Sequence, residues 1–141
     1  MGNTQHDTRR GKLPFVANED LTGKAGFLAK VVSNAGVPES SLPTANDDST
    51  LYLVEEEAIQ GAIAGLKPLS PEENAMVWAK GSGSAGDVLV LADVGTAADR
   101  GKVRTLPAGA GDYFSPGIAE EDFEDGQLVR FRPFPRPVTV S

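Results

Sequence analysis

The chain has 141 residues, a length that suits one domain with a single core. Plentiful glycine and proline, with aromatic residues at only 6%, favour many short strands and turns over long helices. The absence of cysteine excludes disulfides and thiolate metal sites, and a formal net charge of -7 argues against a nucleic-acid partner. No apolar run approaches membrane-spanning length, so no membrane partner is expected.

The first segment, 1–16, is predicted to be a flexible N-terminal arm in front of one β-rich domain over 17–141. Its polar beginning has no apolar periodicity, and a histidine at His6 without a fixed partner is a solvated tail residue rather than a catalytic base. The arm ends in Leu13-Pro14-Phe15-Val16, which is apolar. This run could pack on its own domain or on a neighbouring subunit, and composition does not choose between them.

Strands are predicted where β-branched and large apolar residues run between Gly, Pro, Asn or Asp residues. These runs are 27–32, 51–54, 76–80, 87–92 and 102–106. Between them, 34–50 is predicted to be a loop and 55–65 to be irregular or a short helix. Ser70-Pro71-Glu72-Glu73 has the form of a capping box and predicts one helical turn.

Two short motifs resemble ligand-binding sequences but lack the neighbouring residues or elements that such sites need. Asn46-Asp47-Asp48 could offer oxygen ligands to calcium, but the spaced acids and closing Glu of a calcium loop are missing, which favours a solvated turn. Gly81 to Gly86 matches the dinucleotide fingerprint, which works only when a helix follows. A β run follows instead, so the loop is interpreted as a flexible hairpin connection and no cofactor is expected.

The segment from Gly111 to Pro133 predicts a strand, an acidic turn ending in Asp125-Gly126, and a second strand. An ungapped self-comparison sets Ala64 to Lys80 against Pro116 to Arg132, with glycine, acidic and apolar positions in register. A repeated β-turn-β unit is one interpretation, and a chance likeness of two such units is the other.

Alternating prolines mark the C-terminal tail from Arg132 to Val140. In a strand, Pro133, Pro135 and Pro137 would leave one edge without N–H donors, which is typical of a protected edge strand. A polyproline II tail docked on a neighbour is the rival interpretation. Because no acid follows Asp125, the arginines of this region form a basic strip that is either a solvated strand face or a contact for an acidic partner surface.

No catalytic constellation is found in the sequence, so the protein is not expected to be an enzyme. A cysteine nucleophile and a GxSxG elbow are both absent, and the carboxylates cluster in turns, where solvation is their expected role. We therefore expect no catalytic, cofactor-binding or metal residues. A hydrolase with paired carboxylates remains a third interpretation.

Several runs resemble the capsid cement, or head decoration, proteins of tailed bacteriophages, and the resemblance covers Phe15 to Ser141. The runs are NEDLTGKAGFLAKVV, LPTANDDSTLYLVEEEA, KPLSPEENAMVWAKGSGSAGDVLVLAD and GKVRTLPAGAGDYFSPGIAEEDFEDGQLVRFRP. In that family the elements matching Gly117 to Glu121 and Asp125 to Val129 belong to the barrel and not to a chemical site. The motifs are structural ones.

The resemblance implies a mainly β fold, a small antiparallel barrel or sandwich with an extended N-terminal arm and short helical turns. It implies attachment to the outer surface of a phage head, with the major capsid protein and the protein's own copies as partners, a homotrimer more readily than a homodimer. Synthesis would take place in the bacterial host cytoplasm. The expected interface residues are Leu13, Phe15, Val16, Phe134, Arg136, Val138 and Val140. The alternative is a β-barrel binding module for a peptide or carbohydrate.

Overall fold

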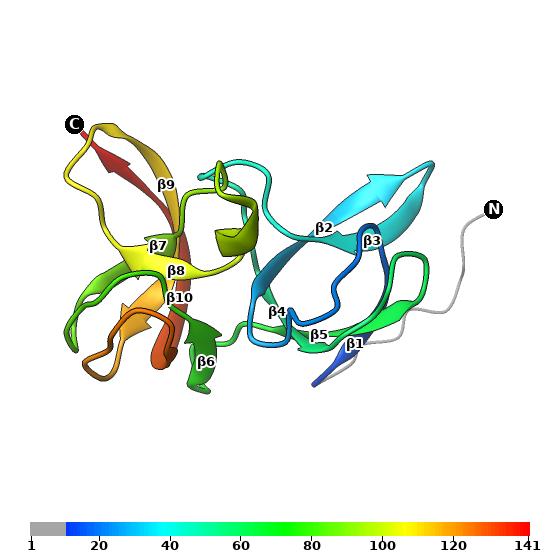
Figure 1. Cartoon of the computed structure of the whole chain (residues 1–141), viewed down its shortest axis with the longest axis horizontal. Helices are drawn as coiled ribbons and strands as arrows, with labels where there is room; N and C mark the ends of the chain where they lie inside the picture. Colours follow the sequence, from blue (N-terminus) through cyan, green and yellow to red (C-terminus); the bar gives the residue numbers. More distant parts are fainter. Residues whose placement is uncertain (1–10) are drawn as a thin grey trace.

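The computed structural model describes residues 11–141, which form two β-sheets and one short 3-10 helix (Figure 1). This confirms the predicted mainly β fold. The first sheet contains β1 (Leu13–Ala17), β2 (Leu28–Asn34), β3 (Val37–Ser41), β4 (Tyr52–Glu56) and β5 (Ile63–Pro68). The second contains β6 (Ala75–Trp78), β7 (Val88–Leu91), β8 (Val103–Thr105), β9 (Gly111–Ala119) and β10 (Leu128–Val140), with the helix η1 (Ala97–Asp99) between β7 and β8.

The first sheet closes into a barrel in the order β1-β3-β2-β4-β5. Its strands pair antiparallel except for β1 and β3, which run parallel. The expected arm boundary at residue 16 is therefore wrong, because Leu13 to Val16 lie in β1 and pair with β5 as a structural part of the barrel. Residues 1–10 of the predicted arm lie outside the described part of the chain.

Strand β3 lies in the segment predicted to be a loop, and β5 begins in the segment predicted to be irregular or a short helix. Strand β3 is polar, and its Ser40 is fully buried, with a hydroxyl that donates to the Val16 carbonyl oxygen at 3.3 Å. Strand β5 buries Ala64 and Leu66 inside the barrel and has Gly65 between them. Both strands form because they pair with strands distant in the sequence, and local composition does not predict such pairing.

The second sheet has the order β6-β10-β9-β7-β8, and the predicted hairpin is the antiparallel pair β9 and β10. The motifs Gly117 to Glu121 and Asp125 to Val129 belong to this hairpin, so they lie outside the closed barrel. The proposed repeat is not supported, because β5 is a barrel strand and β6 pairs with β10 in the other sheet. The Gly81 to Gly86 loop joins β6 to β7, which are not neighbours, so it is not a hairpin connection.

The proline-rich tail is an edge strand, as one of the two interpretations predicted. Beyond Phe131, β10 pairs only with β9 among the described strands. Phe114 donates its backbone N–H to the Asn46 carbonyl oxygen at 3.1 Å, away from β10. Its partner Pro137 therefore lies in a pair without β9–β10 hydrogen bonds, and its ring nitrogen faces the open edge. On the other side of the register shift, Ala119 donates its N–H to the Asp87 carbonyl oxygen, away from β10. The alternation from its partner Phe131 therefore places the Pro133 nitrogen at the same edge, where it blocks further strand pairing.

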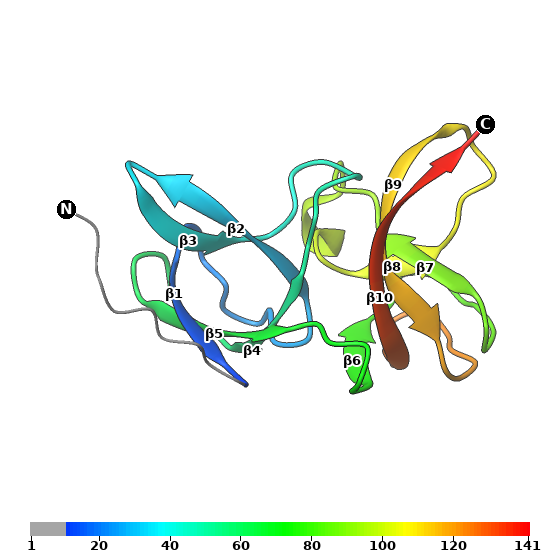
Figure 2. The same ribbon diagram turned by 180° about the vertical axis from the view of Figure 1, so that it is seen from behind.

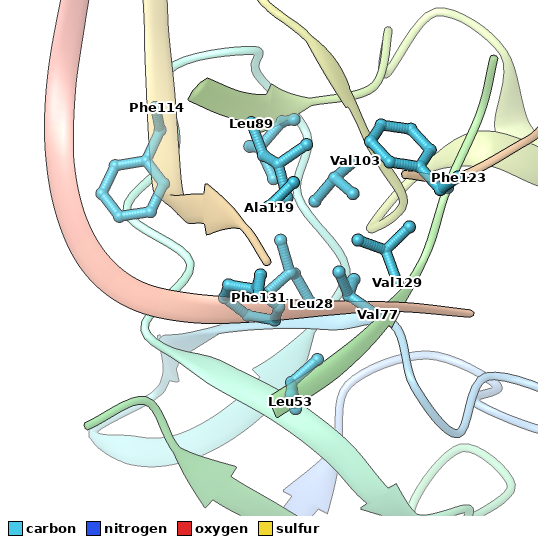
Figure 3. Packing of buried hydrophobic residues seen from close by; sticks show 12 residues of the cluster. Leu28, Leu53, Val77, Leu89, Val103, Phe114, Ala119, Phe123, Val129 and Phe131 are labelled. Carbon is cyan, nitrogen blue, oxygen red and sulfur yellow. The ribbon is translucent and has the colours of Figure 1, made fainter. Parts of the chain in front are cut away.

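The two sheets share part of one core, so the barrel and the second sheet pack directly on each other. Leu28 and Leu53 come from the barrel, yet they belong to the same buried cluster as Val77 and Phe131 of the second sheet, and Figure 3 shows Leu28 beside Phe131. Figure 2, seen from behind, shows β10 crossing the second sheet with β6 between it and the barrel. A separate cluster fills the barrel interior.

Candidate interaction surfaces

The Asn46-Asp47-Asp48 cluster connects segments of the fold, as its hydrogen bonds show. The Asp48 carboxylate accepts hydrogen bonds from Lys30 Nζ at 2.8 Å and from the Thr44 and Ala45 amides. Burial raises the pKa of Asp48, but these hydrogen bonds outweigh it and hold the pKa at about 2. Asn46 Oδ1 accepts the Val94 N–H at 3.0 Å, so the loop joins the barrel side of the chain to the segment after β7.

The acidic turn after β9 holds the glycine-rich loop in place. Asp125 accepts the Gly81 N–H at 2.7 Å, and Asp122 accepts the Ala85 N–H at 2.9 Å. The hydrogen bond from Gly81 lowers the pKa of Asp125. Both motifs that resemble ligand sites thus form hydrogen bonds within the protein. Strand β7 follows the glycine-rich loop, where a dinucleotide site needs a helix.

Chemical sites find little support in the described part of the chain. Within residues 11–141 no group of three or more His, Cys, Asp or Glu side chains could hold a metal ion. The same residues contain no helix long and apolar enough to cross a membrane. The structure does offer exposed apolar surface, and two regions of it combine residues from several strands.

The first region, called the barrel patch here, consists of Pro14, Val16, Val37 and Ile63 on the outer face of the barrel. The register places Val16 opposite Ile63 of β5 and beside Glu39 of β3, and Val37 lies on the Glu39 face two residues earlier. Ile63 is 67% exposed and Val37 49%. Residues far apart in the sequence therefore form one apolar surface across three adjacent strands.

The acidic side chain beside the barrel patch is hydrogen-bonded by neighbouring side chains. The carboxylate of Glu39 accepts hydrogen bonds from the side-chain amides of Asn18 at 2.8 Å and Asn34 at 3.2 Å. At the border, Lys12 forms an ion pair with Glu56, and that hydrogen bond raises the pKa of Lys12. The patch therefore presents apolar surface with its one central carboxylate already hydrogen-bonded.

Leu13 and Phe15, two of the expected interface residues, face the other way. They pair with Leu66 and Ala64, both fully buried, so their side chains lie on the inner side of the barrel wall. Phe15 packs edge-on against Tyr52, with ring centroids 5.7 Å apart. These two residues therefore support the barrel, and Val16 alone of the three expected β1 residues faces outward.

The second region is a groove of about 500 Å³ between the barrel and the second sheet, called the inter-sheet groove here. Exposed Met76 and Leu128 and the half-buried Trp78 form its apolar floor, with Glu55 and Lys67 among its polar lining. The Trp78 indole donates to the Ala25 carbonyl oxygen at 2.9 Å, which fixes the ring. Sequence reasoning missed this groove, because its residues come from both sheets.

The expected C-terminal interface residues all lie in β10. Phe134 is 54% exposed, and the Arg136 guanidinium lies 4.7 Å from its ring centroid. Val138 and Val140 are half-buried and pair with β9. A register shift between Pro133 and Arg136 contains Phe134, and β-bulges of this kind re-aim side chains. Phe134 and Arg136 are called the β10 knob below.

Two arginines of the predicted basic strip share one acidic side chain. Glu120 lies 3.1 Å from Arg132 and 3.8 Å from Arg130. Among the described residues Arg136 has no such ion pair, so it is the arginine of this strip whose charge remains available.

The fold is that of a solved phage protein. No family model matches the chain, and no curated protein matches it. A solved structure described as the crystal structure of the head fiber gp8.5 N base in bacteriophage phi29 is similar, with a TM-score of 0.66 and 18% sequence identity. The match covers 87% of this chain and 92% of that one, so it includes both sheets.

Proposed function

We propose that this protein is a structural component of a bacteriophage head: a decoration, or capsid cement, protein on the outer surface that stabilises contacts between major capsid subunits. The observation that carries the proposal is the fold shared with the phi29 head fiber base over nearly the whole chain. The resemblance of the sequence to decoration proteins supports it independently. A decoration protein attaches to the head through many repeated contacts, and this attachment requires no catalysis.

The barrel patch is the surface we assign to the head. It is apolar and has few charges, as the centres of protein interfaces are, and it lies beside the end of the described chain that leads into residues 1–10. Val16 is retained from the expected interface, and Ile63 and Val37 join it. Leu13 and Phe15 act indirectly by holding β1 in the barrel wall.

Binding to undecorated heads tests this assignment directly. Purified protein is mixed with heads that lack it and sedimented, and the bound fraction is compared for wild type and Ile63→Ser. We expect Ile63→Ser to weaken attachment by about 1 to 3 kcal/mol per site, multiplied by avidity on the lattice. Leu106→Ser is a matched control, because Leu106 is also exposed, at 38%, and lies after β8 in the other sheet.

Three outcomes would count against the proposal. If wild-type protein never binds heads, the decoration function is wrong. If Leu106→Ser loses binding and Ile63→Ser keeps it, the head contact lies on the second sheet. If the protein instead binds a peptide or carbohydrate array and ignores heads, the alternative module is favoured, although Trp78 is the sole aromatic residue that lines the inter-sheet groove.

A further inference from the structure

We propose that the β10 knob of one copy inserts into the inter-sheet groove of a second copy, with Phe134 on the apolar floor and Arg136 paired with Glu55 on the rim. The inference rests on the proposed function and deepens it, because it names the surface through which copies of the protein contact one another. Its test uses purified protein without heads. A failure here is therefore distinct from a failure of head attachment.

The chemistry of the knob fits an interface anchor. Phe134 is an exposed aromatic side chain in a bulged stretch of an edge strand, and Arg136 stacks over its ring. Aromatic residues and arginine are enriched among the side chains that dominate binding energy at interfaces. Because the Arg136 charge is not paired with a carboxylate among the described residues, it can be paired with one on a partner.

The chemistry of the groove is complementary to that knob. Its floor contains Met76, which is 43% exposed, and Leu128, which is 38% exposed, and a flexible methionine adapts to an inserted ring. Glu55 is exposed in the groove lining and makes no ion pair with any described residue. An aromatic ring beside a cation thus matches an apolar floor beside a carboxylate.

A second copy of this chain is the occupant that these observations favour. Every copy carries both the knob and the groove, so two copies can exchange knobs about a two-fold axis, or successive copies can bind head to tail and close into a ring. Strand addition at the β10 edge is blocked by Pro133 and Pro137, so side chains rather than backbone must supply the contact.

Charge reversal with rescue is the test. The mass of the purified full chain is measured by sedimentation velocity over a range of concentrations, for wild type, Arg136→Glu, Glu55→Arg and the double variant. We expect wild type to self-associate and each reversal to weaken association by about tenfold or more, since it places like charges together. The double variant should recover most of the loss, because it restores the opposite charges.

Apolar variants complete the test. Phe134→Ser should also weaken association by about tenfold or more, whereas Ile63→Ser on the barrel patch should leave it unchanged. Circular dichroism of each variant confirms that the β fold is retained. The proposal is overturned if wild type stays monomeric throughout, if the double reversal recovers nothing, or if Ile63→Ser disrupts association while Phe134→Ser does not. The last result would move the contact between copies to the barrel patch.

Discussion

Arg100 donates two parallel hydrogen bonds to the Glu19 carboxylate, although 81 positions separate them in the chain. Nη1 and Nη2 each lie 3.0 Å from a carboxylate oxygen, and Nε and Nη2 also donate to the carbonyl oxygens of Pro43 and Leu42. Glu19 follows β1 and Arg100 follows η1, so the pair ties the barrel to the second sheet. Both side chains are mostly buried, with 22% and 28% of their area exposed.

Removing this carboxylate charge should destabilise the whole protein. Glu19→Gln leaves the guanidinium in a partly buried site without its counter-charge, and we expect a loss of about 1 to 3 kcal/mol in the free energy of unfolding. Urea denaturation measures it. Glu56→Gln is the control, because the Lys12–Glu56 pair is exposed and its loss should change stability much less. Equal losses for both variants would show that Glu19 contributes no more than a surface ion pair.

Asp48 should make stability depend on pH in the acid range. Its folded-state pKa of about 2 lies below the ordinary value of 3.8, so its contribution is present above pH 3.8 and is lost as pH falls through about 2. Asp48→Asn should therefore cost about 1 to 2 kcal/mol at neutral pH, allowing for partial solvent exposure. The difference from wild type should shrink as the pH approaches 2.

Denaturant titrations at several pH values measure this effect. Asp47→Asn is the neighbouring control, since Asp47 is exposed and should change stability by less than about 0.5 kcal/mol. A wild-type advantage over Asp48→Asn that stays constant from neutral pH down to pH 2 would contradict the assigned hydrogen bonds.

Gly117 is required by the close approach of β9 and β10. A Cβ atom at this position would lie 2.0 Å from the backbone oxygen of Arg132, which cannot move without breaking the ladder. Gly117→Ala should therefore lower the free energy of unfolding by about 1 to 3 kcal/mol or more. Gly109→Ala is the matched control, because the nearest atom there is 3.9 Å away, and its thermal midpoint should stay close to that of wild type.

Substitutions at Phe15 and Ile63 should distinguish a residue that stabilises the fold from one that only forms surface. Phe15 packs on Tyr52 at the barrel interior, so Phe15→Ala should reduce the free energy of unfolding by about 1 to 3 kcal/mol. Ile63→Ala removes an exposed side chain and should change it by less than about 0.5 kcal/mol. Thermal unfolding of both variants measures these changes. If Phe15→Ala is as stable as wild type, Phe15 does not support the barrel and is again a candidate surface contact.

Local pattern predicted the strands whose residues alternate or run apolar between strong turn signals. Strands β2, β4, β6, β7 and β8 lie within two residues of the predicted ranges, and the β9–β10 hairpin was expected with its acidic turn. The Ser70-Pro71-Glu72-Glu73 segment is a hydrogen-bonded turn and not helix, with the Glu73 N–H donating to the Ser70 carbonyl oxygen at 3.1 Å. The predicted helical turn is therefore wrong, and the chain continues into β6 from Ala75.

The expected interface was only partly predictable, because a run of apolar letters does not say which way each side chain points. Leu13 and Phe15 point into the barrel and Val16 points out, a consequence of the two-residue period of a strand once β1 pairs with β5. Val37 and Ile63 have no neighbours in sequence that mark them as one surface with Val16. Their common face depends on β1 lying between β3 and β5.

By itself the sequence determined the mainly β class and the acidic hairpin, because short-range alternation, glycine and charge decide these features locally. It left the C-terminal tail open between an edge strand and a polyproline II segment, and pairing with β9 decided for the strand. The tertiary structure decided that β1 closes a barrel, that Glu19 meets Arg100, and that Met76, Leu128 and Glu55 share one groove. The physical reason is that these features depend on strand order and register. Both are set by burial and backbone pairing between residues far apart in the chain.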